Sequence, residues 1–440
     1  MGGYELDVSA RERVPRWLGY GTPVFTVLAA LAVGAVALVA LGVNPVAAYG
    51  AMFVDTLTTP FGITEVFLRA VPLVLTGLAV YLPLRAGLWN IGAEGQLYLG
   101  AIVGTWVGLN VTGPAVVVVP LALVGAAVAG GVWGLVPGLL RARRGVNEII
   151  VTLMLTFVGV ELAGFLVRGP MRGGQGNFPV SETLPEAAQL PTLGGLLPGF
   201  DRIHLGVLVA VLATLAIRYL LRQTKTGYEV TVTGANADAA EGAGIDVEWV
   251  YVFVLVAGGT LAGLAGAIEV AGIQDQLRPD FSPGYGFTAI PVALLGRRGA
   301  LRVALAGLFF AVLVVGGSSM ELAFAVPAAI VEVIQALVIL FLITAEFFKR
   351  YRVSLERDRT AAPMCVFEAD GEIRARTRCE THGDQSDRLW HDAGIYHRAR
   401  RLDAESRHPT LDRDETVAGI GNITVTNRCD RSCHYCFFYA

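Results

Sequence analysis

The segment AGLWNIGAEGQLYLGAIVGTW, from Ala86 to Trp106, decides the fold. It is glycine-rich, mostly apolar and long enough to cross a bilayer, yet it carries Asn90, Glu94 and Gln96 near one end. Because an ionisable side chain is costly inside a membrane, such a residue is by default a candidate for function. We therefore expect about the first 350 residues to be organised around this segment.

The composition of the 440-residue chain indicates an integral membrane protein. Hydrophobic residues make up 54% of the chain and charged residues only 16%, whereas soluble domains average about 25% charged. Charges are sparse from Gly21 to Phe348, and all five cysteines lie after Lys349. We expect a cytoplasmic amino-terminal segment over 1–20, a transmembrane domain over 21–350, and a soluble, short, irregular tail that carries the cysteines over 351–440.

Ten apolar segments are candidates for membrane-spanning helices. They are Pro23–Val43, Glu65–Leu84, Gly87–Asn110, Pro114–Leu140, Val146–Val167, Ile203–Leu221, Trp249–Gly272, Phe287–Gly296, Val303–Ser319 and Val326–Phe348. The first of these is expected to be followed by a loop that extends to Gly62. With the amino terminus in the cytoplasm, the strong basic clusters also fall inside, at Arg141, Arg222, Arg297 and Lys349. The prediction is an all-α, multi-pass fold of about ten transmembrane helices, within a range of eight to ten, with both termini cytoplasmic.

The polar residues of the opening segment admit two interpretations. Asn90 and Glu94 are four residues apart, so a helix would place them on one face. Either Asn90, Glu94 and Gln96 line a polar path through the bundle, or Glu94 joins two helices by hydrogen bonds. Glycines that also recur every fourth residue predict a close approach of two helices, at Gly100, Gly104 and Gly108. Other intramembrane polar residues are more easily explained as structural or as near a membrane interface, at Glu161, Glu269, Glu332 and Gln335.

The polar loop from Thr224 to Ile245 is longer than a connection between two spans requires. Asn236 is a favourable N-cap and Asp238 suits the positive end of a helix, so Ala237–Glu241 should form one or two helical turns. A short capped helix in a cytoplasmic loop can dock into a groove on a soluble partner. The alternative is a plain connection between spans.

Three motifs together resemble one family. NIGAEGQ after Gly–Leu–Trp, TGYEVTVTGANADAAEGAGI, and SPGYGFTAIPVALLG resemble, in this order, the permease subunits of ABC importers for nucleosides and simple sugars, in the branched-chain amino acid/ribose permease superfamily. The resemblance implies a homo- or heterodimer of permeases, an ATPase subunit on each, and an extracytoplasmic substrate-binding lipoprotein. It implies that Asn90–Gln96 lies by the translocation path. It also implies that the ATPase contact is made by Gly234, Asn236, Asp238, Ala239, Ala240, Gly244 and Ile245.

The cysteines of the tail form a second pattern. Cys429, Cys433 and Cys436 have the spacing CxxxCxxC after an alternating apolar segment, Ile420–Thr426, that predicts a strand. Three such thiolates can hold a 4Fe–4S cluster. The motif resembles the signature of radical S-adenosylmethionine enzymes, and a weaker upstream group resembles the piece that precedes it in archaeal members, at Cys365, Cys379 and His382. Because the chain ends at Ala440, we expect an inactive fragment in which cluster and S-adenosylmethionine sites are vestigial.

The sequence therefore predicts a non-enzymatic permease in the cytoplasmic membrane that imports a nucleoside or simple sugar. No GxxxxGK[ST] phosphate loop occurs in the chain, so ATP would be hydrolysed by a partner, and transport needs no cofactor of its own. Nucleic acid is not an expected partner, because acidic residues interleave with the arginines of Arg398–Arg401. A membrane-tethered radical enzyme and a secondary transporter without an ATPase are the alternatives.

Overall fold

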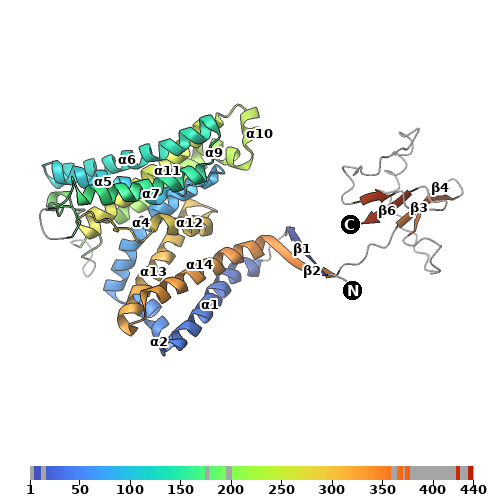
Figure 1. Cartoon of the computed structure of the whole chain (residues 1–440), viewed down its shortest axis with the longest axis horizontal. Coiled ribbons are helices and arrows are strands. Elements are labelled where there is room, and N and C mark those ends of the chain that lie inside the picture. Colours follow the sequence, from blue (N-terminus) through green and yellow to red (C-terminus); the bar gives the residue numbers. More distant parts are fainter. Residues whose placement is uncertain are drawn as a thin grey trace. The chain divides into compact units, whose positions relative to one another are not determined.

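The computed structural model describes residues 4–10, 16–173, 178–194, 201–357, 364–369, 372–376, 423–426 and 435–439. The chain forms two compact units (Figure 1). One is helical and covers Pro15–Phe347, and the other consists of Met1–Val14 and Phe348–Ala440.

Helices build the first unit, and their ends follow local capping signals. Thr59, Asn147 and Asp246 each precede a helix and accept a backbone N–H with the side chain, as N-caps do. The α-helices are α1 (Arg16–Ala40), α2 (Pro45–Tyr49), α3 (Thr56–Thr58), α4 (Pro60–Arg85), α5 (Ala93–Asn110), α6 (Ala115–Arg144), α7 (Glu148–Arg168), α8 (Gly206–Gln223), α9 (Lys225–Ala235), α10 (Ala237–Gly242), α11 (Val247–Glu269), α12 (Tyr285–Gly296), α13 (Ala300–Phe324) and α14 (Ala328–Arg350). Two π-helices and a 3-10 turn complete the set, at η1 (Gly50–Asp55), η3 (Val270–Gln274) and η2 (Glu186–Ala188).

Six helices of the described residues are long and apolar enough to cross a membrane. They are α4, α6, α7, α8, α11 with its η3 extension, and α13. Shorter apolar stretches lie in α1, α12 and α14. The predicted helical, multi-pass architecture is confirmed for this unit, whereas the number of ten crossings stays a prediction.

Helix α5 is not one of these six, although it occupies most of the expected span Gly87–Asn110. Its first turn carries Glu94, and Gln96 follows, which lowers its hydropathy. The helix packs against α4, α6, α7 and α11, and Figure 1 shows α5, α6, α7 and α11 side by side. A helix enclosed by other helices does not have to be apolar along its length, because protein shields its polar end from lipid.

Glycines bring α5, α6 and α11 into direct backbone contact, as the spacing of Gly100 and Gly104 predicted. A Cβ added at Gly100 would lie 2.1 Å from the carbonyl oxygen of Gly263, and one at Gly104 would lie 2.8 Å from Cβ of Ala267. A Cβ at Gly130 of α6 would lie 2.2 Å from the carbonyl oxygen of Gly259. Only residues without side chains permit such an approach.

Three local predictions were wrong. The span expected from Gly87 begins only at Ala93, because Gly87 has a φ of +81° and residues 86–92 form a turn. The stretch before Pro60, expected to be a loop, contains α2, η1 and α3. The first half of the polar loop after α8 is the helix α9, which its β-branched residues did not suggest.

The second unit contains strands, in contrast to the irregular tail that was expected. β1 (Tyr4–Ala10) pairs antiparallel with β2 (Tyr351–Arg357). A four-stranded sheet has the order β4 (Glu372–Arg376), β3 (Met364–Ala369), β6 (Tyr435–Tyr439) and β5 (Ile423–Thr426). The strand predicted before the cysteine motif is confirmed as β5.

The cysteine prediction is only partly covered by the described residues. Cys365 of β3 and Cys436 of β6 are opposite each other in the antiparallel register. The remaining predicted ligands lie outside the described residues, at Cys379, His382, Cys429 and Cys433. The iron–sulfur cluster therefore stays a prediction.

Candidate functional site

Asn90 and Gln96, two of the predicted path residues, are paired with each other. Nδ2 of Asn90 donates to Oε1 of Gln96 at 2.9 Å, and Nε2 of Gln96 donates back to Oδ1 of Asn90 at 3.3 Å. Asn90 also donates to the carbonyl oxygen of Ala79 in α4 at 3.2 Å. Both side chains are buried. The pair thus attaches the turn before α5 to α4 and to the first turns of α5.

Glu94 connects α5 to α12. Its Oε2 accepts the backbone N–H of Gly286 at 2.5 Å, and Ser282 lies within hydrogen-bonding reach of the same carboxylate. Gly286 is in the first turn of α12, where N–H groups lack partners inside the helix and favour a negative charge. The expectation that Asn90 and Glu94 share a helix face was wrong, because Asn90 precedes the helix. The hydrogen-bonding interpretation of Glu94 therefore describes its contacts in this structure.

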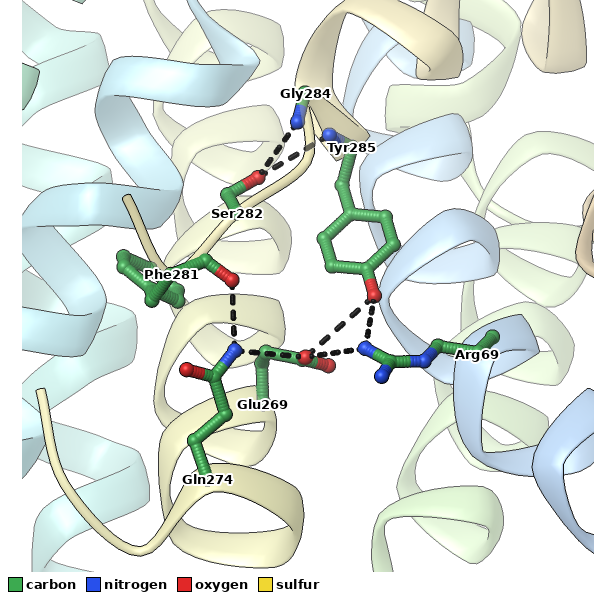
Figure 2. A network of polar contacts seen from close by, with 7 residues as sticks. All are labelled: Arg69, Glu269, Gln274, Phe281, Ser282, Gly284 and Tyr285. Carbon is green, nitrogen blue, oxygen red and sulfur yellow. Dashed lines mark hydrogen bonds and ion pairs between the residues drawn. The ribbon is translucent and has the colours of Figure 1, made fainter. Parts of the chain in front are cut away.

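A denser polar network lies next to this contact (Figure 2). Glu269, the last residue of α11, is fully buried. Its Oε1 accepts Nη1 of Arg69 at 2.9 Å and Nε2 of Gln274 at 3.2 Å. Tyr285 lies between them, because its hydroxyl accepts Nη1 of Arg69 at 2.7 Å and is 3.5 Å from Oε1 of Glu269. Four elements meet here: α4, α11, η3 and α12.

The backbone around this network is irregular. Glu269 is followed directly by the π-helix η3, which ends at Asp275 with a positive φ of 58°. Gln274 donates to the carbonyl oxygen of Phe281 at 2.7 Å, which ties the loop after η3 to the network. Ser282 accepts the N–H groups of Gly284 and Tyr285 at 3.2 Å each and so shapes the start of α12. π-helical turns inside helices occur frequently at functional sites.

This network was not predicted from the sequence. Glu269 was expected to be structural or near a membrane interface, and Arg69, Gln274 and Tyr285 were not singled out. One signal was available, since Arg69 is a cation and Glu269 an anion, each inside an apolar run. Of the other polar candidates, Glu161 and Glu332 are exposed, and Gln335 donates to the carbonyl oxygen of Leu313 at 3.1 Å.

The predicted coupling segment forms the expected capped helix. Oδ1 of Asn236 accepts the N–H of Ala239 at 3.0 Å and starts α10. Asp238 and Ala239 are exposed, whereas Ala240 is buried. After the helix, Gly244 takes a left-handed φ of +80°, and the N–H of Ile245 donates to the carbonyl oxygen of Ala240 at 3.0 Å. The outer side of α10 is therefore exposed in the single subunit.

Helix α9 connects this segment to the turn before α5. A Cβ at Gly234 would lie 2.0 Å from the carbonyl oxygen of Arg85, so the two backbones touch. Nη2 of Arg85 also donates to Oγ1 of Thr231 at 3.2 Å. The turn that begins after Arg85 leads to Trp89, whose N–H donates to Oε1 of Glu148 at 3.3 Å, and on to Asn90. A displacement of α9 would thus reach the residues that hold α5 and α12.

A bundle of apolar helices in which polar side chains meet at interrupted helix ends is typical of membrane transport proteins. The branched-chain amino acid transport system / permease component family matches residues 62–343, and the chain belongs to it. The chain is 61% identical over 376 residues to the glucose ABC transporter permease protein TsgB13 of Haloferax volcanii. The matched region covers 84% of this chain and 99% of that protein.

Two further relatives carry related names. The guanosine ABC transporter permease protein NupP of Bacillus subtilis is 34% identical over 323 residues, with 72% of this chain and 91% of that protein covered. The nucleoside ABC transporter permease protein NupB of Lactococcus lactis is 29% identical over 329 residues, with 73% and 89% covered. These relatives are transport subunits and not enzymes, and the chain is accordingly a multi-pass permease subunit of an ABC importer.

Proposed function

We propose that this permease imports a neutral, hydroxylated solute, either glucose or a nucleoside, across the cytoplasmic membrane. The observation that carries the proposal is the 61% identity to a permease named for glucose, over nearly the whole of that relative. The relatives named for guanosine and nucleosides keep the second solute class open. Glucose and a nucleoside both present a sugar ring with several hydroxyl groups.

In the proposed complex, two permease subunits enclose the path and each binds an ATPase on the side of α10. The exposed residues Asp238 and Ala239 would enter a groove of the ATPase. Movement of α9 would be passed through Arg85 to the turn that carries Asn90, and from Glu94 to the start of α12. Asn90, Glu94 and Gln96 would then lie beside the path and control its opening.

We also propose ten crossings with both ends of the chain in the cytoplasm. The six long apolar helices, the three shorter ones in α1, α12 and α14, and the enclosed helix α5 make ten. β1 precedes α1, and β2 follows α14 directly. The antiparallel pairing of these strands, from Tyr4 with Arg357 to Ala10 with Tyr351, supports the proposal that both ends share one side of the membrane and that the number of crossings is even.

Uptake by a reconstituted complex tests the proposal. The chain is inserted into vesicles with its ATPase and second permease, a binding protein is added, and uptake of radiolabelled glucose and guanosine is measured. We expect uptake of one of the two solutes that depends on ATP and stops when the ATPase active site is inactivated. Uptake that proceeds without the ATPase would refute the proposal and favour a secondary transporter.

A further inference from the structure

One oxygen of the most buried acid in the bundle has no partner. Oε2 of Glu269 makes no hydrogen bond within the described residues, although the side chain is fully buried. The other oxygen, Oε1, already accepts from Arg69 and Gln274. A buried carboxylate oxygen without a donor is costly, roughly 1–3 kcal/mol or more, and such an atom requires an explanation.

The charges around Glu269 select the kind of molecule that would supply a donor. Arg69 pairs with Glu269, so the cluster is close to neutral overall. A cation would be repelled by the guanidinium, and an anion by the carboxylate. A neutral hydroxyl group fits, because its hydrogen can be donated to Oε2 of Glu269. A neighbouring hydroxyl on the same ring can accept from Arg69 or pair with Tyr285, since both side chains point toward Glu269 in Figure 2.

The surroundings provide access to the cluster. The Arg69 side chain is 30% exposed, so the network reaches the surface of the single subunit through this residue. The stretch between η3 and α12 is not helical. Irregular backbone at membrane depth is tolerated only where protein covers it or where it lines an aqueous cavity. Transporters place solute sites at such interruptions between helices.

We infer that Glu269, with Arg69 and Tyr285, forms a contact site for the vicinal hydroxyl groups of a sugar ring during transport. The inference rests on the proposed function and adds to it the atoms that recognise the solute. It places recognition at the end of α11, apart from the Asn90–Gln96 pair, whose polar atoms satisfy each other. Opening at η3 and α12 would uncover Oε2 of Glu269, and closing would require the hydroxyl to leave.

Paired solutes test the site without interference from the binding protein. ATP-dependent uptake is measured for glucose and its monodeoxy analogues, and for guanosine with 2′-deoxyguanosine and 3′-deoxyguanosine. For each variant the uptake rate of the parent solute is divided by that of each analogue. Because the same saturating binding protein serves every variant, a change in this ratio belongs to the permease. A hydrogen bond to a charged group corresponds to at least about a tenfold preference.

We expect Glu269→Gln to lower the ratio for one analogue by about tenfold, and Glu161→Gln, at an exposed position of α7, to leave every ratio unchanged. Glu269→Asp keeps the charge opposite Arg69 and withdraws the oxygens by one methylene, so it should lower the same ratio even if the Gln variant is inactive. A purely structural ion pair would reduce both rates equally and leave the ratios as in the wild type, which would overturn the inference. Absence of ATP-dependent uptake in the wild type would instead refute the proposed function.

Discussion

Replacement of Gly234 by alanine would separate α9 from the end of α4. The added Cβ would lie 2.0 Å from the carbonyl oxygen of Arg85 and 3.1 Å from the carbonyl carbon of Ala86. Ordinary contact begins near 3.4 Å, so the two backbones must move apart by about 1.4 Å. No side chain can rotate to relieve this contact, because the opposing atoms belong to the main chain.

The displacement falls on the proposed connection between the ATPase and the path. Forcing an extra methyl group into a packed contact costs about 1–3 kcal/mol. If α9 and the turn after Arg85 move as one unit in the transport cycle, that energy weakens their coupling by about 5- to 150-fold. We therefore expect Gly234→Ala to reduce the number of solute molecules imported per ATP by at least about fivefold, while ATP hydrolysis continues.

The assay compares uptake and phosphate release in the same reconstituted vesicles. Gly50→Ala is the matched control, because Gly50 has helical backbone angles, no atom lies within 4 Å of its added Cβ, and it is remote in sequence from α9 and α10. The control should keep the wild-type ratio of uptake to hydrolysis, and both variants should be present in the membrane in equal amounts. A wild-type ratio for Gly234→Ala would show that α9 does not transmit motion through Arg85.

Three further changes give separate tests. Glu94→Ala removes the acceptor of the Gly286 N–H, so uptake should be lost while membrane insertion stays normal. Glu94→Gln still offers an acceptor oxygen and should retain part of the uptake, whereas full uptake by the alanine variant would show that Glu94 only fills space. Burial lowers the pKa of His204 to about 4, so between pH 6.5 and 4 the unfolded chain binds more protons than the folded chain. The free energy of unfolding in detergent should therefore fall by on the order of 3 kcal/mol as the pH drops through that window. His204→Asn can still accept the Gly206 N–H and should abolish this slope; equal slopes would disprove the assignment. Gly263→Ala puts a Cβ 2.3 Å from the Ala126 carbonyl oxygen, so it should destabilise the protein by about 1–3 kcal/mol and lower its melting temperature. In the control Gly113→Ala the added Cβ lies 3.7 Å from Val118, so the melting temperature should not change. Equal melting temperatures for the two variants would argue against close helix packing at Gly263.

Signals that act over a few residues were sufficient to predict part of this structure. The Asn236 cap and the short helix α10 follow from residues that are neighbours in sequence. The glycines of α5 predicted a close neighbour because their spacing itself defines a helix face. The same local reasoning missed α9, whose threonines and valines favour other conformations, because the helix packs against α8, α11 and α4, which are tertiary contacts.

Contacts between residues that are distant in the sequence could not be predicted from it. Glu94 was recognised as costly, but its partner Gly286 is 192 residues away. Arg69 and Glu269 are 200 residues apart, and either could have been a residue at a membrane interface. The turn at Gly87 was not predicted, because apolar residues continue through it and hydropathy does not show where a chain turns.

The backbone contacts among α5, α6 and α11 have a mechanical consequence. Two helices that meet through side chains can slide when those side chains change rotamer, but carbonyl groups against glycine Cα atoms have no such freedom. The three helices should therefore move as one block, and the motion of a transport cycle must arise at its edges, at η3 and α12. A pair of spin labels on α6 and α11 should report one distance in every state, which makes this block the fixed frame against which the rest of the cycle can be measured.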